Sequence, residues 1–264
     1  MSDKILFIME GEKEDPQLLK KLFAAYRDFL DFDENAVGKE VIVSYASHIY
    51  SLYSELKKLE NDDGFFADLF PIVKKKDPDL SGYSSDDFSA IYLFFDLDIH
   101  GRDEKEISSQ LKEMVETFDN ETGNGKLFIS YPMVEAAKIC DKTDGLFKKD
   151  RKMFPLDSCK KGGFKQFANN HTRSAIKTDS LEEWNLICKE NYRKANWILN
   201  EKESNPDIHS LKGMEQEDIL DKELEFVKNE KSVATLSAYP MWLKDQLDPE
   251  TIEKLFYNKL SEKV

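Results

Sequence analysis

The stretch Ser89–His100 constrains the fold more than any other part of this sequence. Six consecutive apolar or aromatic residues, Ala90–Phe95, lead directly into two acids, Asp96 and Asp98. An uninterrupted apolar run of this length is typical of a strand that is buried on both faces, as in the middle of a parallel sheet. Asp96 and Asp98 are two residues apart, so a regular strand would project them to the same side. They also follow the carboxyl end of the strand, where open α/β sheets place their sites.

Two carboxylates that are held close together need a counter-charge, and a hard cation with oxygen ligands is the usual one. Taken alone, an Asp-x-Asp pattern is more often a strand end with solvated acids. A second acidic strand end lies upstream, because the apolar run Lys4–Met9 stops at Glu10. Gly11 allows a tight turn there, and Pro16 suits the first turn of a helix.

The first 140 residues alternate between strand and helix patterns, which predicts an α/β fold with a mostly parallel, Rossmann-like sheet flanked by helices. Residues 1–140 would form this core, with an insertion at 60–88 where breakers and loop-like segments gather. Residues 141–264 would form a mainly helical extension packed on the core, with one late strand at 232–238. The expected strands of the core are 4–9, 40–45, 89–95 and 126–131, and its expected helices are 16–30, 49–59 and 104–118.

Composition excludes several classes of protein. Hydrophobic residues make up 40% of the 264-residue chain, which is enough for a folded core, so the chain is not a disordered one. The net charge of −14 argues against adhesion of the whole surface to nucleic acid or anionic lipid. The three cysteines are scattered, which suits a reducing compartment and makes a zinc site or a disulfide framework unexpected. With no long apolar run and no secretory pattern, we expect a cytoplasmic protein that does not enter a membrane.

The two acidic strand ends give the sequence a resemblance to a known superfamily. The segments 5–14, which ends in Glu-Gly-Glu-Lys-Glu, and 91–98, which ends in Asp-Leu-Asp, are similar to the two motifs of the Toprim fold. The opening motif looks most like those of the OLD-family and RloB-like nucleases that act in defence. Those proteins tend to carry a Pro-x-x-Glu after the following strand, and the segment 132–135 is similar. The resemblance covers roughly residues 4–140.

The resemblance implies a nuclease that needs Mg²⁺ or Mn²⁺ and cleaves phosphodiester bonds in DNA or RNA, as a toxic effector in bacterial anti-phage defence. Glu10 would be a metal ligand or a general acid or base, and Asp96 and Asp98 would hold the metal. Glu14 stands where related proteins carry a further acid, and Glu135 would serve a second metal. The chemistry agrees with this assignment, since a cation must neutralise the charge that develops when an anionic phosphodiester is attacked.

Basic residues offer a candidate surface for the nucleic-acid substrate. Residues 148–177 hold the main concentration of lysine and arginine in an acidic chain, with phenylalanines interleaved. The pattern suits a surface that follows a phosphate backbone, and it equally suits a solvated face that balances nearby acids. The basic residues that we expect to contact nucleic acid are Lys13, His100, Arg102, Lys160, Lys161, Lys165 and Arg173.

Two other functions compete with the nuclease. A phosphatase of the haloacid-dehalogenase type also starts from a strand followed by Asp-x-Asp, and would use Asp96 as nucleophile and Asp98 as general acid. A non-catalytic protein with the same fold could instead bind a regulatory partner. The chain contains no P-loop motif, so an ATPase or sensor would have to be a separate partner. Self-association into a homo-oligomer is left open.

Overall fold

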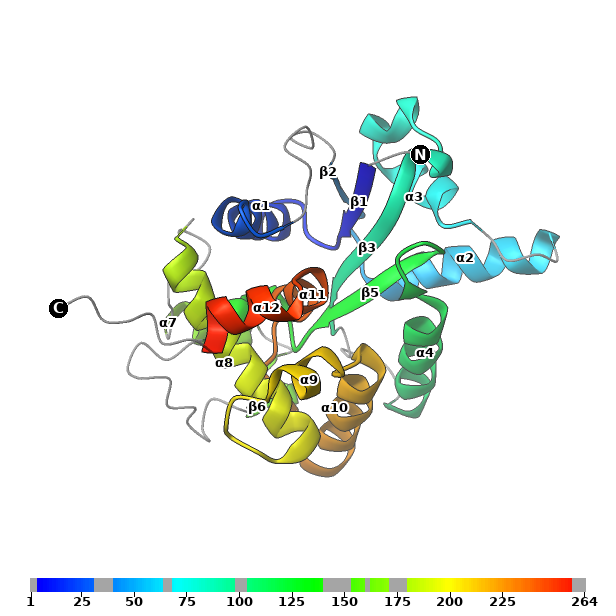
Figure 1. Cartoon of the computed structure of the whole chain (residues 1–264). Helices are drawn as coiled ribbons and strands as arrows, with labels where there is room; N and C mark the ends of the chain where they lie inside the picture. Colours follow the sequence, from blue (N-terminus) through cyan, green and yellow to red (C-terminus); the bar gives the residue numbers. More distant parts are fainter. Residues whose placement is uncertain are drawn as a thin grey trace.

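The computed structural model describes residues 4–30, 40–63, 68–97, 104–139, 153–159, 162–170 and 180–257. Its main sheet has the strand order β2-β1-β3-β5-β4 (Figure 1). Four of these strands run parallel, and β4 forms a short antiparallel hairpin with β5. The strands of this sheet are β1 (Lys4–Met9), β2 (Glu40–Ser44), β3 (Phe88–Asp96), β4 (Asp119–Asn120) and β5 (Gly125–Ser130).

The order of the strands creates a switch point between β1 and β3. From β1 the chain moves outward to β2, whereas from β3 it moves in the opposite direction to β5. In parallel sheets of this kind, ligands bind outside the carboxyl ends of the strands at the point where the direction reverses. β1 ends at Met9 and β3 ends at Asp96, so both acidic sequence segments reach this point.

Helices cover both faces of the sheet. On one face, the ring of Phe7 from β1 meets Phe23 of α1 and Trp242 of α11. On the other face, Tyr53 of α2 packs edge-on against Phe118, which directly follows α4. The helices are α1 (Glu14–Tyr26), α2 (Ile49–Asp63), α3 (Phe70–Lys76), α4 (Glu104–Thr117), α6 (Leu156–Cys159), α7 (Gly163–Asn170), α8 (Leu181–Asn200), α9 (Ile208–Lys212), α10 (Gln216–Glu230), α11 (Ala238–Gln246) and α12 (Pro249–Ile252). These findings confirm the predicted α/β class with a mostly parallel sheet between helices.

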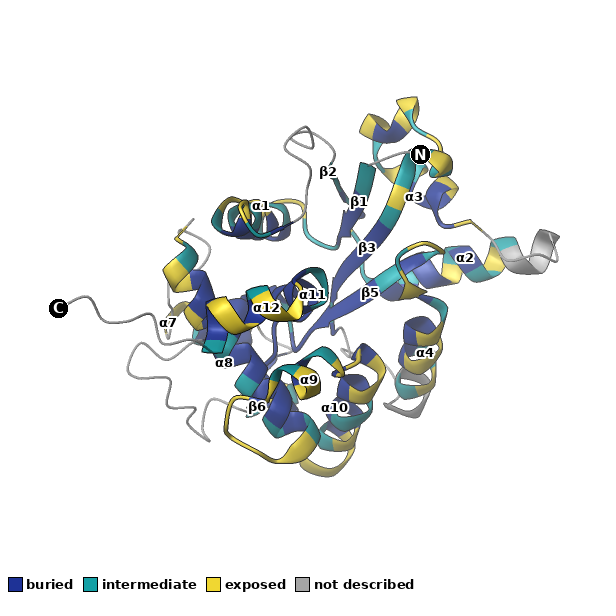
Figure 2. Ribbon diagram, in the orientation of Figure 1, coloured by how far each residue is buried: buried dark blue, intermediate teal, exposed yellow. Residues whose placement is uncertain are grey.

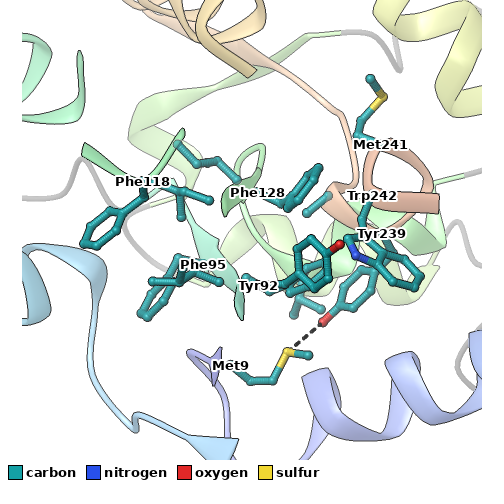
Figure 3. Close-up of a cluster of buried hydrophobic side chains, with 14 of the residues drawn as sticks. Met9, Tyr92, Phe95, Phe118, Phe128, Tyr239, Met241 and Trp242 are labelled. Carbon is teal, nitrogen blue, oxygen red and sulfur yellow. Dashed lines mark hydrogen bonds between the residues drawn. The ribbon is translucent and has the colours of Figure 1, made fainter. Parts of the chain in front are cut away.

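The C-terminal region completes the core of the sheet. Figure 3 shows Tyr239 and Trp242 of α11 lying against the aromatic side chains of β3 and β5. Tyr239 stacks on Phe94 with ring centroids 4.9 Å apart, and Trp242 is fully buried. Much of the sheet is coloured as buried, while exposed residues lie mainly on the helices and connecting turns (Figure 2). The two regions therefore share one hydrophobic core.

The C-terminal region also adds strands of its own. Tyr131, just after β5, exchanges two backbone hydrogen bonds with Leu236, of 2.8 and 2.9 Å. A separate antiparallel pair joins β6 (Met153–Pro155) to β7 (Ser232–Ala234). The predicted strand at 232–238 is thus too long, because β7 ends at Ala234 and α11 begins at Ala238, and the strand β6 was not predicted. α8 packs against α1 and α11, and α10 against α4.

The predicted insertion at 60–88 is described at 60–63 and 68–88. Residues 60–63 continue α2, residues 70–87 form short helices and turns, and Phe88 already begins β3. After α3 come two 3₁₀ turns, η2 (Pro78–Gly82) and η3 (Ser85–Asp87). A further 3₁₀ helix, η4 (Val134–Lys138), follows β5, and a π-helical turn, η6 (Glu253–Tyr257), follows α12. Within the described ranges, no helix combines the length and the apolar character needed to span a membrane.

Candidate active site at the carboxyl edge of the sheet

Glu10 and Asp96 meet at the switch point, although 86 residues separate them in sequence. The backbone N–H of Asp96 donates a 3.0 Å hydrogen bond to Glu10 Oε2. The backbone N–H of Glu10 in turn donates to the carbonyl oxygen of Phe94, also over 3.0 Å. Neighbouring parallel strands that end at the same level therefore place the two acids side by side. We call Glu10 and Asp96 the strand-end acids.

Asp15, which the sequence analysis did not single out, lies beside them at the start of α1. It is buried, and its Oδ1 accepts a 2.9 Å hydrogen bond from the hydroxyl of Tyr239. A side chain at Gly11 would collide with the Asp15 carboxylate. Glycine at position 11 therefore leaves room for the Asp15 carboxylate in its present position, and its backbone is not left-handed. Burial raises the pKa of Asp15 to about 6, and the nearby charges of Glu135 and Glu14 add to this rise against the effect of the Tyr239 hydrogen bond.

A second pair of acids, Glu14 and Glu135, lies close by and is bridged by lysines. Lys165 of α7 places its Nζ 3.0 Å from Glu135 Oε1 and 3.3 Å from Glu14 Oε1. Lys138, at the end of η4, lies 3.9 Å from Glu14 Oε2. The two carboxyl groups also share a hydrogen bond. We call Glu14 and Glu135 the bridged acids.

The bridged acids differ in their pKa values because their surroundings differ. Burial pushes the pKa of Glu14 upward, but the hydrogen bond to Glu135 and the positive charges of Lys138 and Lys165 outweigh it and leave the pKa lowered. Glu135 is almost fully buried, and this burial, together with the hydrogen bond to Glu14, raises its pKa in spite of Lys165. The two carboxyl groups thus influence each other, and the lysines favour the charged form of Glu14.

Asp96 is the acid of this group whose charged form is most strongly disfavoured by its surroundings. Its side chain keeps some contact with solvent, but protein atoms crowd the carboxylate. This loss of hydration raises the pKa of Asp96 well above its usual value, and the negative charges of Glu10, Asp15 and Glu135 raise it further. The backbone N–H of Val134, in η4, hydrogen-bonds to the carboxylate and opposes the shift. No lysine, arginine or histidine within the described residues forms an ion pair with Asp96.

Several predicted site residues lie outside the described residues: Asp98, His100, Arg102, Lys160, Lys161 and Arg173. Of the remaining basic residues, Lys13 is exposed beside the turn, and Lys165 faces the bridged acids. Sequence reasoning missed Asp15, Lys138 and Tyr239. Asp15 directly follows the Glu-Gly-Glu-Lys-Glu segment, and Lys138 comes three residues after Glu135. Their closeness in sequence to these motifs could have identified both. Nothing in the local sequence links Tyr239 to Asp15.

The donor chemistry of the strand-end acids suits a divalent cation. Both offer carboxylate oxygens, which are the ligands that Mg²⁺ and Mn²⁺ prefer. Asp96 lies among three other acids, an arrangement that a bound cation would relieve. The described side chains do not by themselves form a cluster of three that could hold a metal ion. The predicted third donor, Asp98, is outside the described residues.

Comparison with known proteins adds no relative from which to assign a role. No family model matches the chain, and no match is found among the curated proteins or the solved structures. The resemblance to the Toprim superfamily therefore rests on the strand-end segments themselves.

Proposed function

We propose that this protein is a metal-dependent nuclease with a Toprim-like core, which hydrolyses phosphodiester bonds in DNA or RNA. The observation that carries the proposal is the contact between the strand-end acids across β1 and β3, at the switch point of a parallel sheet. Acids from two motifs that are distant in sequence meet at the position where such sheets bind their ligands. The defence setting, and a separate ATPase or sensor partner, rest on the resemblance alone.

In this proposal the chain's own residues fix the geometry of the site. The N–H of Asp96 holds one oxygen of the Glu10 carboxylate in place, and the N–H of Val134 does the same for the Asp96 carboxylate. Glu10, Asp96 and the predicted third ligand, Asp98, would hold Mg²⁺ or Mn²⁺. When bound, the cation supplies charge neutralisation at the phosphate and an activated water. Because backbone groups of the sheet and of η4 orient both carboxylates, little reorganisation is needed on binding.

The test is cleavage of single- and double-stranded DNA and RNA with Mg²⁺ or Mn²⁺, comparing the protein with its Asp96→Asn variant. Asp86→Asn is a matched control, because Asp86 is an exposed acid just before β3, at the opposite end of the strand. We expect Asp96→Asn to lose cleavage and Asp86→Asn to keep it. Undiminished cleavage by Asp96→Asn would overturn the assignment. Hydrolysis of a small phosphomonoester in place of the nucleic acids would favour the phosphatase.

A further inference from the structure

A small second core brings α7 against the site. Phe164 and Ala168 of α7 are fully buried and pack with Ala136 and Ile139, which lie in and just after η4. The ring of Phe154 lies 5.0 Å from that of Phe164, edge to face. This packing fixes the helix that carries Lys165 beside the 3₁₀ helix that carries Glu135.

α8 fixes the other side of the same segment. Lys194 is buried, and its Nζ donates a 2.7 Å hydrogen bond to the carbonyl oxygen of Ile139, at the end of η4. η4 is thus held from two sides, by α7 and α8, and both helices come from the C-terminal region. The position of Glu135 relative to Lys165 is consequently a property of packed backbone elements.

The bridged acids and Asp96 differ in the counter-charges that the described residues give them. Lys165 contacts both bridged acids, and Lys138 adds a second positive charge at Glu14. No described lysine, arginine or histidine pairs with Asp96. A divalent cation at Glu14 and Glu135 would have to displace an ammonium group that already serves both, whereas a cation at Asp96 would replace no such group.

We infer that Lys165 is a positioning residue that takes the place of a second metal ion, so that the protein binds one divalent cation, at the strand-end acids. This inference rests on the proposed function. It assigns Glu14 and Glu135 to the anchoring of Lys165, and not to metal ligation as the resemblance implied. It also gives the C-terminal region a role in the site, since the residue that sets the number of metal ions comes from α7.

The experiment is a calorimetric titration of the full chain with Mn²⁺ after removal of bound metal by a chelator. It compares the protein with Lys165→Met, with Lys165→Arg, and with Lys20→Met. Lys20 lies exposed on α1, so Lys20→Met matches the loss of one positive charge at another surface position. We expect one Mn²⁺ per chain for the protein, for Lys165→Arg and for Lys20→Met. We expect Lys165→Met to bind two, the second at least about 10-fold more weakly.

The possible results separate this inference from the proposal on which it rests. Two Mn²⁺ ions on the unaltered protein, or one on a folded Lys165→Met variant, would overturn the inference and leave the nuclease proposal standing. No Mn²⁺ on the unaltered protein would overturn both. If Lys165→Met fails to fold, Glu135→Gln decides: one Mn²⁺ with an affinity within about 3-fold supports the inference, and loss of that ion contradicts it.

Discussion

The strand-end acids and the bridged acids are close neighbours that are built in different ways. Glu10 and Asp96 are placed by the ends of two adjacent parallel strands, and a backbone N–H of one orients the carboxylate of the other. Glu14 and Glu135 come from a helix start and a 3₁₀ helix, and a lysine from a third element holds them. Within the described residues Asp96 has no basic partner, so its charge is left for a ligand to neutralise, whereas lysines already neutralise the second pair. An acidic cluster is therefore not one site merely because its members lie close together.

The largest expected difference between the two pairs is in metal binding. Glu10→Gln should weaken Mn²⁺ binding by about 100-fold or more and reduce cleavage by about 10³-fold, because a cation that stabilises the transition state contributes several kcal/mol. Glu14→Gln should change the Mn²⁺ affinity by no more than about 3-fold. Calorimetry measures the Mn²⁺ affinity of each variant, and a cleavage assay measures its activity. Equal losses in the two variants would remove the distinction between the pairs.

Substitution of Asp15 tests how far the buried negative charge near the two pairs affects stability. Its pKa is raised to about 6 by burial, so the folded state binds a proton more tightly than the unfolded state. Such a group favours folding at low pH, and this contribution is lost as the pH rises from about 4 to about 6. Asp15→Asn should therefore change the free energy of unfolding little at pH 4, and should raise it by up to about 3 kcal/mol at pH 8.

Chemical denaturation of metal-free protein at several pH values measures this difference. A chelator must be present throughout, because a bound cation would itself stabilise the carboxylates. If Asp15→Asn changed the free energy of unfolding by the same amount at pH 4 and at pH 8, folding would not raise the pKa of Asp15. A variant less stable than its parent at pH 8 would show that the hydrogen bond from Tyr239 requires the carboxylate.

Tyr239→Phe tests how much the Tyr239 hydroxyl, from the C-terminal region, stabilises the buried Asp15 carboxylate. The substitution removes the hydroxyl that donates to Asp15 and leaves a buried carboxylate without that donor. We expect a loss of about 1–3 kcal/mol in the free energy of unfolding at pH 8, and a smaller loss at pH 4, where Asp15 is protonated. Tyr83→Phe is the control, since Tyr83 lies partly exposed in the segment before β3 and should change stability by less than about 0.5 kcal/mol.

Lys165→Met should have the smallest effect on stability, despite its effect on metal stoichiometry. About half of the Lys165 side chain is exposed, and ion pairs of this kind contribute roughly 0–1 kcal/mol. The free energy of unfolding of metal-free protein should therefore fall by less than about 1 kcal/mol, and by less still in high salt. A loss above about 2 kcal/mol would indicate that the ion pairs, more than the aromatic cluster of Phe154 and Phe164, hold α7 in place.

Much of the core could be predicted because its signals are local. The apolar runs at Lys4–Met9 and Ala90–Phe95 indicate strands that are buried on both faces, and they form the two inner strands of the four parallel ones. Since the carboxyl ends of parallel strands share one edge, the strand predictions place Glu10 and Asp96 at the same edge. Their direct contact depends on β1 and β3 being neighbours, which the structure decides. The helix pattern before β5 was read in the same way, from apolar positions that recur with the helical period.

The surroundings of the site could not be predicted in this way. Lys165 belongs to a basic stretch whose composition suits a nucleic-acid surface, yet its ammonium group contacts two acids of the same chain. Tyr239 lies 224 residues from Asp15, in the helix α11 that follows the late strand. No periodicity links such positions, because their contacts depend on how whole elements pack.

The sequence by itself determined the α/β class, the central strands and the edge of the sheet where the strand-end acids gather, since backbone periodicity and strand direction are encoded locally. Only the tertiary structure decided which acids receive a lysine, that Asp15 is buried beneath Tyr239, and that the C-terminal region shares the core of the sheet. The physical reason is that a side chain's counter-charge and its hydration are set by neighbours from distant segments, and these neighbours are chosen by packing.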